Sequence, residues 1–270
     1  MKMNDILQTI VACKRREVAD WKKTADFETA LTRVGEGFSR PTHSMRASLA
    51  ASGSGIIAEF KRKSPSKGWL YPDADAAEVV PAYERSGAGA CSILTDGPFF
   101  GGSLEDLRRA RERVKNLPLL RKDFIVDASQ LHQARAAGAD AVLLIASVLT
   151  PDECAALAEA AHGLDLEVLL EVHAEDELGH LNRDIDMLGV NNRHLGTFHT
   201  DVENSFRLAD RMREAVEAQG FSPLLVSESG LAGMDTVRRL RAVGFRGFLI
   251  GETFMKTGHP GRALSEFLNG

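Results

Sequence analysis

Short apolar segments rich in β-branched residues recur along most of the chain and alternate with longer stretches of helical periodicity. Between the apolar segments lie Ala-, Glu- and Arg-rich stretches such as LEDLRRARERVK and MDTVRRLRAVG. Continuous apolar strands that alternate with helices favour parallel pairing with right-handed crossovers, and eight such units can close into a barrel. We therefore predict an α/β protein with a (β/α)8 TIM-barrel fold. The eight predicted strands are 56–60, 91–94, 117–120, 141–145, 167–170, 187–190, 224–226 and 247–250.

The segment before the first predicted strand has a different pattern. Residues 4–23 place Ile6, Ile10 and other apolar side chains on one helical face, which must cover another surface. The stretch 38–55 is rich in small residues, ends in ASGSG, and is predicted as a linker into the first strand. We expect residues 1–270 to form a single domain, with residues 1–55 as an N-terminal helical extension.

Two local features bear on the barrel prediction. An open doubly wound sheet is the alternative fold, but no G-x-G-x-x-G motif follows the first strand. Pro81 lies inside DAAEVVPAYERSGAG, the first helical stretch after that strand. Because proline removes a backbone donor, we expect it to shorten or kink this helix.

Composition narrows the class of protein. The net charge of −5 gives no footprint for binding a polyanion, so we expect no nucleic-acid partner. Cys13, Cys91 and Cys154 are odd in number and form no C-x-x-C motif, which argues against a disulfide framework or a structural zinc site. No apolar run approaches the roughly 18 residues of a membrane span, and the N-terminus lacks a continuous apolar core. We predict a cytoplasmic protein that needs no membrane.

Polar groups follow nearly every predicted strand at its C-terminal end. In a barrel these ends converge on one mouth, where enzymes of this architecture carry their active sites. Polar residues also mark ordinary strand-to-loop transitions, but several lysines and glutamates at one mouth are hard to explain as a solvated rim. The strand-end residues are Glu59, Lys61, Asp96, Lys122, Asp123, Ser147, Glu171, Asn191, Asn192, Arg193, Glu228, Ser229, Gly230, Gly251 and Glu252.

The last two strand ends, SESG and IGET, are built from small residues. Glycine lets backbone N–H groups approach an anion, and barrels commonly bind phosphate in the loops after these two strands. Ser229, Gly230, Gly251 and Glu252 are therefore candidates for a phosphate site, although the Glu252 carboxylate would have to turn away from the anion. Tight turns alone could also explain these glycines.

Several motifs, in order, resemble the indole-3-glycerol phosphate synthase family of tryptophan biosynthesis. EFKRKSPSKG and LLRKDFIVD carry the most specific similarity, supported by LLEVH, GVNNR, SESG and LIGETFMK. The resemblance covers the chain from about Glu59 to Lys256. It implies ring closure of 1-(2-carboxyphenylamino)-1-deoxyribulose 5-phosphate, with loss of carbon dioxide and water, by an amino-acid biosynthetic lyase. It implies a phosphorylated small-molecule substrate and no metal or organic cofactor, and leaves protein partners open.

The resemblance also implies roles for individual residues. Lys122 matches the general acid for the ketone oxygen, and we expect neighbouring cations to lower its pKa toward that task. Lys61 matches the residue that holds the substrate carboxylate, and Glu171 matches the base that restores aromaticity. Glu59, Asn191 and Glu228 match residues that position the substrate and the lysines. Arg193 matches a contact with the aromatic side of the substrate, and Ser64, in the KSPSKG loop, matches a contact on the phosphate side or in a lid over the substrate.

Other functions remain compatible with a barrel of this kind. A Schiff-base aldolase or a sugar-phosphate isomerase would use Lys122 as a nucleophile. A phosphoribosylanthranilate isomerase would require a Cys/Asp pair, and Cys91 lies within a predicted strand. A metabolite sensor would not require the lysine and glutamate set.

Overall fold

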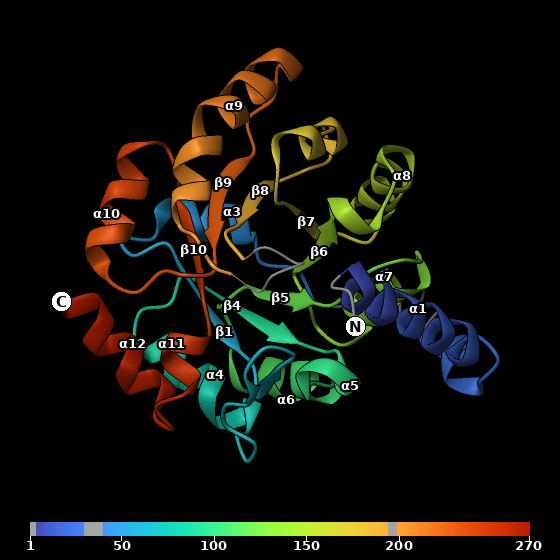
Figure 1. The fold of residues 1–270 in the computed structure, drawn as a ribbon. Helices are drawn as coiled ribbons and strands as arrows, with labels where there is room; N and C mark the ends of the chain where they lie inside the picture. The colour runs from blue at the N-terminus through green and yellow to red at the C-terminus, as the bar shows by residue number, and fades with distance from the viewer. Residues whose placement is uncertain (1–3, 30–39, 194–198) are drawn as a thin grey trace.

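The computed structural model describes residues 4–29, 40–193 and 199–270. Its centre is a closed parallel barrel in the order β1-β10-β9-β8-β7-β6-β5-β4, ringed by helices (Figure 1). This confirms the predicted fold class. The barrel strands are β1 (Ile56–Phe60), β4 (Ala90–Leu94), β5 (Leu119–Lys122), β6 (Ala141–Ile145), β7 (Glu167–Val172), β8 (Met187–Asn191), β9 (Leu224–Glu228) and β10 (Gly247–Ile250).

The remaining elements connect the strands or cover the two ends of the barrel. Two very short strands, β2 (Lys63–Ser64) and β3 (Gly68–Trp69), pair in the loop after β1. The helices are α1 (Asn4–Trp21), α3 (Met45–Ala51), α4 (Ala76–Arg85), α5 (Gly97–Phe100), α6 (Leu104–Arg113), α7 (Ser129–Ala136), η1 (Ala146–Val148), α8 (Pro151–His162), η2 (Glu175–His180), α9 (Glu203–Gln219), α10 (Met234–Ala242), α11 (Glu252–Met255) and α12 (Pro260–Asn269).

Alternation along each strand divides the core into two clusters. Inward residues such as Leu120, Leu169 and Leu249 form the barrel interior. Outward residues such as Phe60 and Leu170 pack with the surrounding helices. Because successive side chains point to opposite faces, the residue following each inward apolar side chain faces out, and the next one faces in again. This alternation selects which strand-end residues reach the mouth.

Helices α1 and α3 lie at opposite ends of the barrel. At the N-terminal ends of the strands, Met45 and Leu49 of α3 are buried in the interior cluster, and the Arg46 N–H donates to Glu167 at the start of β7. At the other end, Ile10 of α1 joins the same cluster near Phe124. The segment that precedes β1 therefore contributes apolar side chains to both ends of the interior.

Two local expectations are wrong. The stretch 38–55 is not only a linker, because it contains α3, whose N-cap Ser44 accepts from Ala47 N–H and whose apolar residues are buried under the barrel. Of the two effects expected of Pro81, the shortening is wrong, since α4 continues past it to Arg85. An interior proline costs about 3 kcal/mol, but burial of Val79, Val80 and Tyr83 outweighs this at roughly 1.5–3 kcal/mol per side chain.

None of the helices in the described ranges is long and apolar enough to cross a membrane.

Candidate active site

A cavity of about 640 Å³ opens at the C-terminal ends of the barrel strands. All twelve residues predicted to have a catalytic or binding role line it. These residues are Glu59, Lys61, Ser64, Lys122, Glu171, Asn191, Arg193, Glu228, Ser229, Gly230, Gly251 and Glu252. Strand alternation brings them together, because inward positions such as 120 and 122, or 169 and 171, continue the apolar interior into a charged mouth.

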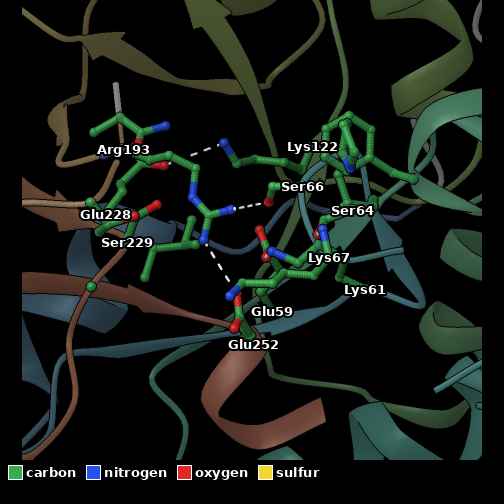
Figure 2. A pocket seen from close by; sticks show the side chains of 18 of the residues that line it. Glu59, Lys61, Ser64, Ser66, Lys67, Lys122, Arg193, Glu228, Ser229 and Glu252 are labelled. Carbon is green, nitrogen blue, oxygen red and sulfur yellow. Dashed lines mark hydrogen bonds and ion pairs between the residues drawn. The ribbon is translucent and has the colours of Figure 1, made fainter. Parts of the chain in front are cut away.

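The Lys122 side chain extends into this mouth (Figure 2). Its Nζ lies 2.8 Å from Glu171 Oε2 and 3.3 Å from Glu228 Oε2. The lysine side chain is 14% exposed, and the two carboxylates are almost fully buried. We call Glu59, Lys61, Lys122, Glu171 and Glu228 the mouth cluster.

The carboxylates set the ionisation of Lys122. Burial alone would lower its pKa, but Glu171, Glu228 and Glu59 outweigh that effect and raise it above the usual lysine value. The expectation that nearby cations lower the Lys122 pKa is therefore wrong, because anions lie closest to it. An ammonium with this pKa stays charged until a stronger base, such as a developing alkoxide, takes its proton.

The two glutamates beside Lys122 shift in opposite directions. Burial raises the Glu171 pKa, but Lys122 and His173 outweigh burial and bring it down to about 2. Burial and repulsion from Glu171 raise the pKa of Glu228 to about 8, against the attraction of Lys122. Like charges this close cannot both ionise easily, so Glu171 holds the charge and Glu228 holds a proton at neutral pH.

Glycines on neighbouring strands leave room for these carboxylates. A Cβ at Gly189 of β8 would lie 2.5 Å from Glu228 Oε1, and a Cβ at Gly251 would lie 2.4 Å from Glu59 Oε1. Glu59 in turn pairs with Lys61, with Nζ and Oε1 2.5 Å apart. Gly251 thus has a packing role besides any contact with phosphate.

The end of β9 has an unusual backbone. Ser229 has φ of 69° and Gly230 has φ of 78°. The left-handed region costs a non-glycine residue roughly 1–2 kcal/mol, and Asn192 Nδ2 holds the turn by donating to the Ser229 carbonyl at 3.0 Å. A Cβ at Gly230 would meet Thr200 at 2.6 Å, so only glycine fits there.

Glu252 turns into the mouth rather than away from it. Its Oε2 lies 3.3 Å from Arg193 Nη2, while Arg193 Nη1 donates to Ser66 Oγ at 2.8 Å (Figure 2). Arg193 therefore links the loop after β1 to the start of α11 across the cavity. Sequence reasoning did not identify Ser66, because nothing in KSPSKG distinguishes it from Ser64.

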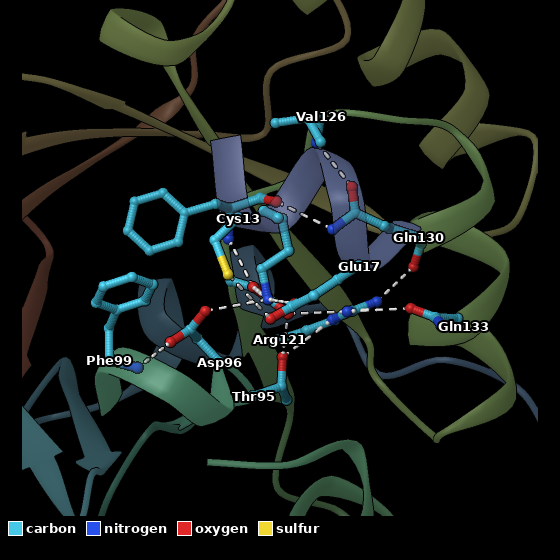
Figure 3. A network of polar contacts seen from close by, with 12 residues as sticks. Cys13, Glu17, Thr95, Asp96, Phe99, Arg121, Val126, Gln130 and Gln133 are labelled. Atoms are coloured by element: carbon cyan, nitrogen blue, oxygen red, sulfur yellow. Dashed lines mark hydrogen bonds and ion pairs between the residues drawn. The ribbon is translucent and has the colours of Figure 1, made fainter. Parts of the chain in front are cut away.

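Some strand-end residues serve other contacts. Asn192 points away from the mouth, accepts from Ser205 Oγ and donates to Ser227 Oγ. Asp96 and Asp123 bind Lys14 of α1, each at 3.1 Å, and Asp123 also lines the cavity. Figure 3 shows the surrounding contacts, which we call the α1 network. Its members are Lys14, Glu17, Thr95, Asp96, Arg121 and Asp123.

The apolar part of the cavity was not identified from the sequence. Ile6, Leu7 and Ile10 of α1 line it together with Phe100 and Phe124. An amphipathic pattern predicts the helix but not the surface on which it docks. The described residues contain no group of three or more His, Cys, Asp or Glu side chains that could hold a metal ion.

A family model and curated relatives that match this chain carry the same name. The family model described as "Indole-3-glycerol phosphate synthase" matches residues 7–267. A curated protein of that name from Bacteroides thetaiotaomicron is 55% identical over 268 residues, covering 98% of this chain and 98% of that protein. Another of that name, from Leptothrix cholodnii, is 42% identical over 270 residues, covering 97% of this chain and 98% of that protein.

Solved structures are similar at the level of the fold. A mutant tryptophan synthase alpha-subunit from Pyrococcus furiosus has a TM-score of 0.60 and 15% sequence identity. The match covers 80% of this chain and 99% of that chain. At this identity it supports the barrel architecture alone.

Proposed function

The chain belongs to the indole-3-glycerol phosphate synthase family and is a carboxy-lyase of tryptophan biosynthesis, and from this premise we propose how its mouth performs the reaction. The substrate is 1-(2-carboxyphenylamino)-1-deoxyribulose 5-phosphate, and the products are indole-3-glycerol phosphate, carbon dioxide and water. The observation that carries the proposal is the Lys122 ammonium held between Glu171 and Glu228 in a cavity with one apolar and one glycine-rich wall.

The two walls orient the substrate. The aromatic ring lies against Ile10, Phe100 and Phe124, where its burial is favourable. The phosphate lies at the glycine-bearing ends of β9 and β10, near Gly230 and Gly251, since backbone N–H groups there can approach an anion. The ketone then lies between them, within reach of Lys122.

Ring closure requires an acid. The ring carbon that bears the carboxylate attacks the C2′ ketone, and the carbonyl oxygen gains negative charge. The Lys122 ammonium donates its proton to this oxygen, which gives a hydroxyl group and a neutral amine. The transfer is favourable despite the raised pKa of Lys122, because an alkoxide is a much stronger base than an amine.

Loss of carbon dioxide and water follows. Lys61 holds the carboxylate before its bond to the ring breaks and the electrons return to the ring. The C2′ hydroxyl then leaves as water after protonation, for which the acid is Lys61, or Lys122 once its amine has regained a proton from solvent. Glu171, ionised in the buried mouth, removes the last proton and restores the aromatic pyrrole.

The remaining mouth residues position these groups. Glu59 holds Lys61, and Glu228 and Asn191 flank Lys122 and Glu171. We further propose that Arg193 contacts the aromatic half of the substrate, while Ser64, Ser229, Gly230, Gly251 and Glu252 form its phosphate side.

We also propose that residues 1–270 form one barrel domain, with residues 1–55 as an N-terminal extension. The enzyme is proposed to be cytoplasmic and to act without a cofactor, a metal, a nucleic acid or a membrane. A protein partner is neither required nor indicated by this chemistry.

A fluorescence assay for indole-3-glycerol phosphate tests the function. We expect continuous product formation by the wild type and a loss of at least ~100-fold in the turnover of Glu171→Gln, because general base catalysis typically contributes that much. Borohydride trapping tests the aldolase alternative, since a Schiff base to Lys122 would be reduced to a stable covalent adduct. An adduct, or no indole product from the wild type, would contradict the proposal.

A further inference from the structure

His173 is a buried ionisable residue that the reaction above does not use. It directly follows β7, two residues after Glu171, and its side chain is 12% exposed. It is not among the residues that line the cavity. Its backbone is fixed on both sides: the His173 N–H donates to Glu177, and Asn204 Nδ2 donates to the His173 carbonyl at 3.1 Å.

The imidazole lies between two carboxylates. Nε2 is 3.4 Å from Glu171 Oε1, and Nδ1 is 3.5 Å from Glu177 Oε2. Both ring nitrogens are buried, and neither has a hydrogen-bond partner among the described residues. A buried polar ring without hydrogen bonds calls for an explanation. Its position indicates an ionic contact with Oε1 of Glu171, the proposed base.

Glu171 has a cation at each oxygen. Oε2 faces Lys122, and Oε1 faces His173. During ring closure Lys122 gives its proton to the ketone and becomes neutral, so Glu171 loses its main counter-charge. A fully buried carboxylate without a cation favours protonation. Glu171 would then take a proton too early, or compete with the ketone for the Lys122 proton.

We propose that His173, as an imidazolium held between Glu171 and Glu177, is the positioning residue that keeps Glu171 ionised while Lys122 serves the substrate. This inference rests on the proposed function, because it assigns His173 a role through the base of that reaction. His173 itself touches no reacting atom.

The surrounding carboxylates favour the imidazolium form of His173. Burial lowers the pKa of His173, but Glu177, Glu171 and more distantly Glu228 outweigh it and raise the pKa above the usual value. Lys122 lies beyond Glu171, and from α9 the Asn204 amide donates to the His173 carbonyl. Three carboxylates thus face one imidazole from β7, η2 and β9.

The pH profile of kcat tests the role. An opposite charge within 4–6 Å lowers a carboxyl pKa by about 1–3 units. In His173→Asn we therefore expect the acidic limb of the kcat profile to move up by about one pH unit or more. KM should change less than about threefold, since His173 does not line the cavity.

Three further variants separate charge from structure. Glu177→Gln leaves the imidazole in place but removes its outer carboxylate, so the limb should move in the same direction by a smaller amount. Glu175→Gln, an exposed glutamate in the same turn, is the matched control and should leave the limb unmoved. His173→Lys restores a cation and should return the limb toward the wild-type position.

The outcomes distinguish this role from its premise. No product from the wild type would contradict the proposed function itself. Product from the wild type with an unmoved limb in His173→Asn and Glu177→Gln would overturn the role of His173 alone. A lower melting temperature with an unmoved limb would likewise assign His173 a purely structural role. If His173→Asn fails to fold, Glu177→Gln decides the question.

Discussion

Two clusters of buried charge meet at β5, which supplies Lys122 to the mouth cluster and Arg121 to the α1 network. Lys122 points into the barrel, and its neighbour Arg121 points out. Three nitrogens of Arg121 donate hydrogen bonds (Figure 3): Nε donates to Thr95 Oγ1, Nη1 donates to the Gln130 carbonyl at 2.6 Å, and Nη2 donates to Asp123 Oδ2 at 2.9 Å. In the mouth, by contrast, neither oxygen of Glu228 accepts a hydrogen bond from any described residue.

The difference shows in two equally buried carboxyl groups, Asp123 and Glu228, although each cluster also holds a carboxyl group whose pKa shifts the other way: burial raises that of Asp96, and Lys122 lowers that of Glu171. Burial raises the pKa of Asp123, but Arg121, Lys14 and hydrogen bonds outweigh it and lower the pKa below its usual value. Glu228 is equally buried, and its pKa rises. A fully paired charge stabilises the fold in one protonation state, whereas an incompletely paired one can change state during a reaction. The α1 network therefore holds the scaffold, and the mouth cluster holds reactive groups.

Breaking the α1 network should have the largest effect on stability. Arg121→Met leaves Asp123 and Thr95 buried without their main donor, which typically costs about 3–5 kcal/mol of unfolding free energy. Denaturant unfolding measures this loss. Turnover of the protein that remains folded should stay within about tenfold of wild type, since Arg121 points away from the cavity.

Arg109→Met is the matched control for that variant. Arg109 forms a surface ion pair with Asp75 at 2.6 Å, and exposed pairs contribute roughly 0–1 kcal/mol. Equal losses in the two variants would refute the structural role of the α1 network.

The second-largest effect is expected in the pH dependence of the unfolding free energy, which should distinguish the mouth cluster from the α1 network. The Glu228 pKa is raised from 4.5 to about 8, so the folded state binds a proton that the unfolded state releases. Stability from this group is complete below about pH 4.5 and is lost as the pH rises toward 8. Between pH 5 and pH 7 the loss should be about 3 kcal/mol, at 1.36 kcal/mol per unit.

Glu228→Gln, which resembles the protonated acid, should abolish that decline, as measured by denaturant unfolding at several pH values. Glu266→Gln on the exposed face of α12 is the control and should retain the decline. Asp123 acts in the opposite direction: its lowered pKa contributes stability above pH 3.8 that is lost in acid. Identical pH profiles for wild type and Glu228→Gln would contradict the protonated state of Glu228.

The smallest effect is expected at the phosphate side. Glu252 faces the mouth and pairs with Arg193. Its carboxylate therefore repels an incoming anion and competes with that anion for the Arg193 guanidinium. Glu252→Ser should lower the inhibition constant of inorganic phosphate, measured at fixed ionic strength, by about two- to fivefold, since the group is partly exposed and screened. Glu203→Ser at the exposed start of α9 serves as control. Weaker phosphate inhibition in Glu252→Ser would reverse the sign of this interaction.

Hydropathy predicted the strands well where an apolar residue ends them. The predicted bounds match β1, β6 and β10, but β5, β7 and β9 extend further, to Lys122, Val172 and Glu228. These strand ends carry charged residues that other groups in the mouth and network stabilise, so a pattern of apolar residues ends too early. The helix α3 was missed for a related reason, since burial of Met45 and Leu49 under the barrel depends on tertiary packing.

The cavity could be predicted from strand ends because parallel strands in a barrel bring their C-terminal ends together. Sequence could not tell which strand-end residues bind groups other than substrate, such as Asp96 with Lys14 and Asn192 with Ser227, because that depends on partners distant in the chain. It also could not reveal that Glu252 faces inward, or that α1 supplies part of the apolar wall.

The turnover of Lys122→Ala tests the central claim most directly, because Lys122 and Arg121 are adjacent in sequence but assigned to different clusters. We predict a fall in kcat of at least ~100-fold for folded Lys122→Ala with substrate binding within about tenfold, while Lys115→Ala, exposed before β5, keeps wild-type turnover. Near-normal turnover by a folded Lys122→Ala protein would contradict the claim that the mouth cluster holds the reactive groups.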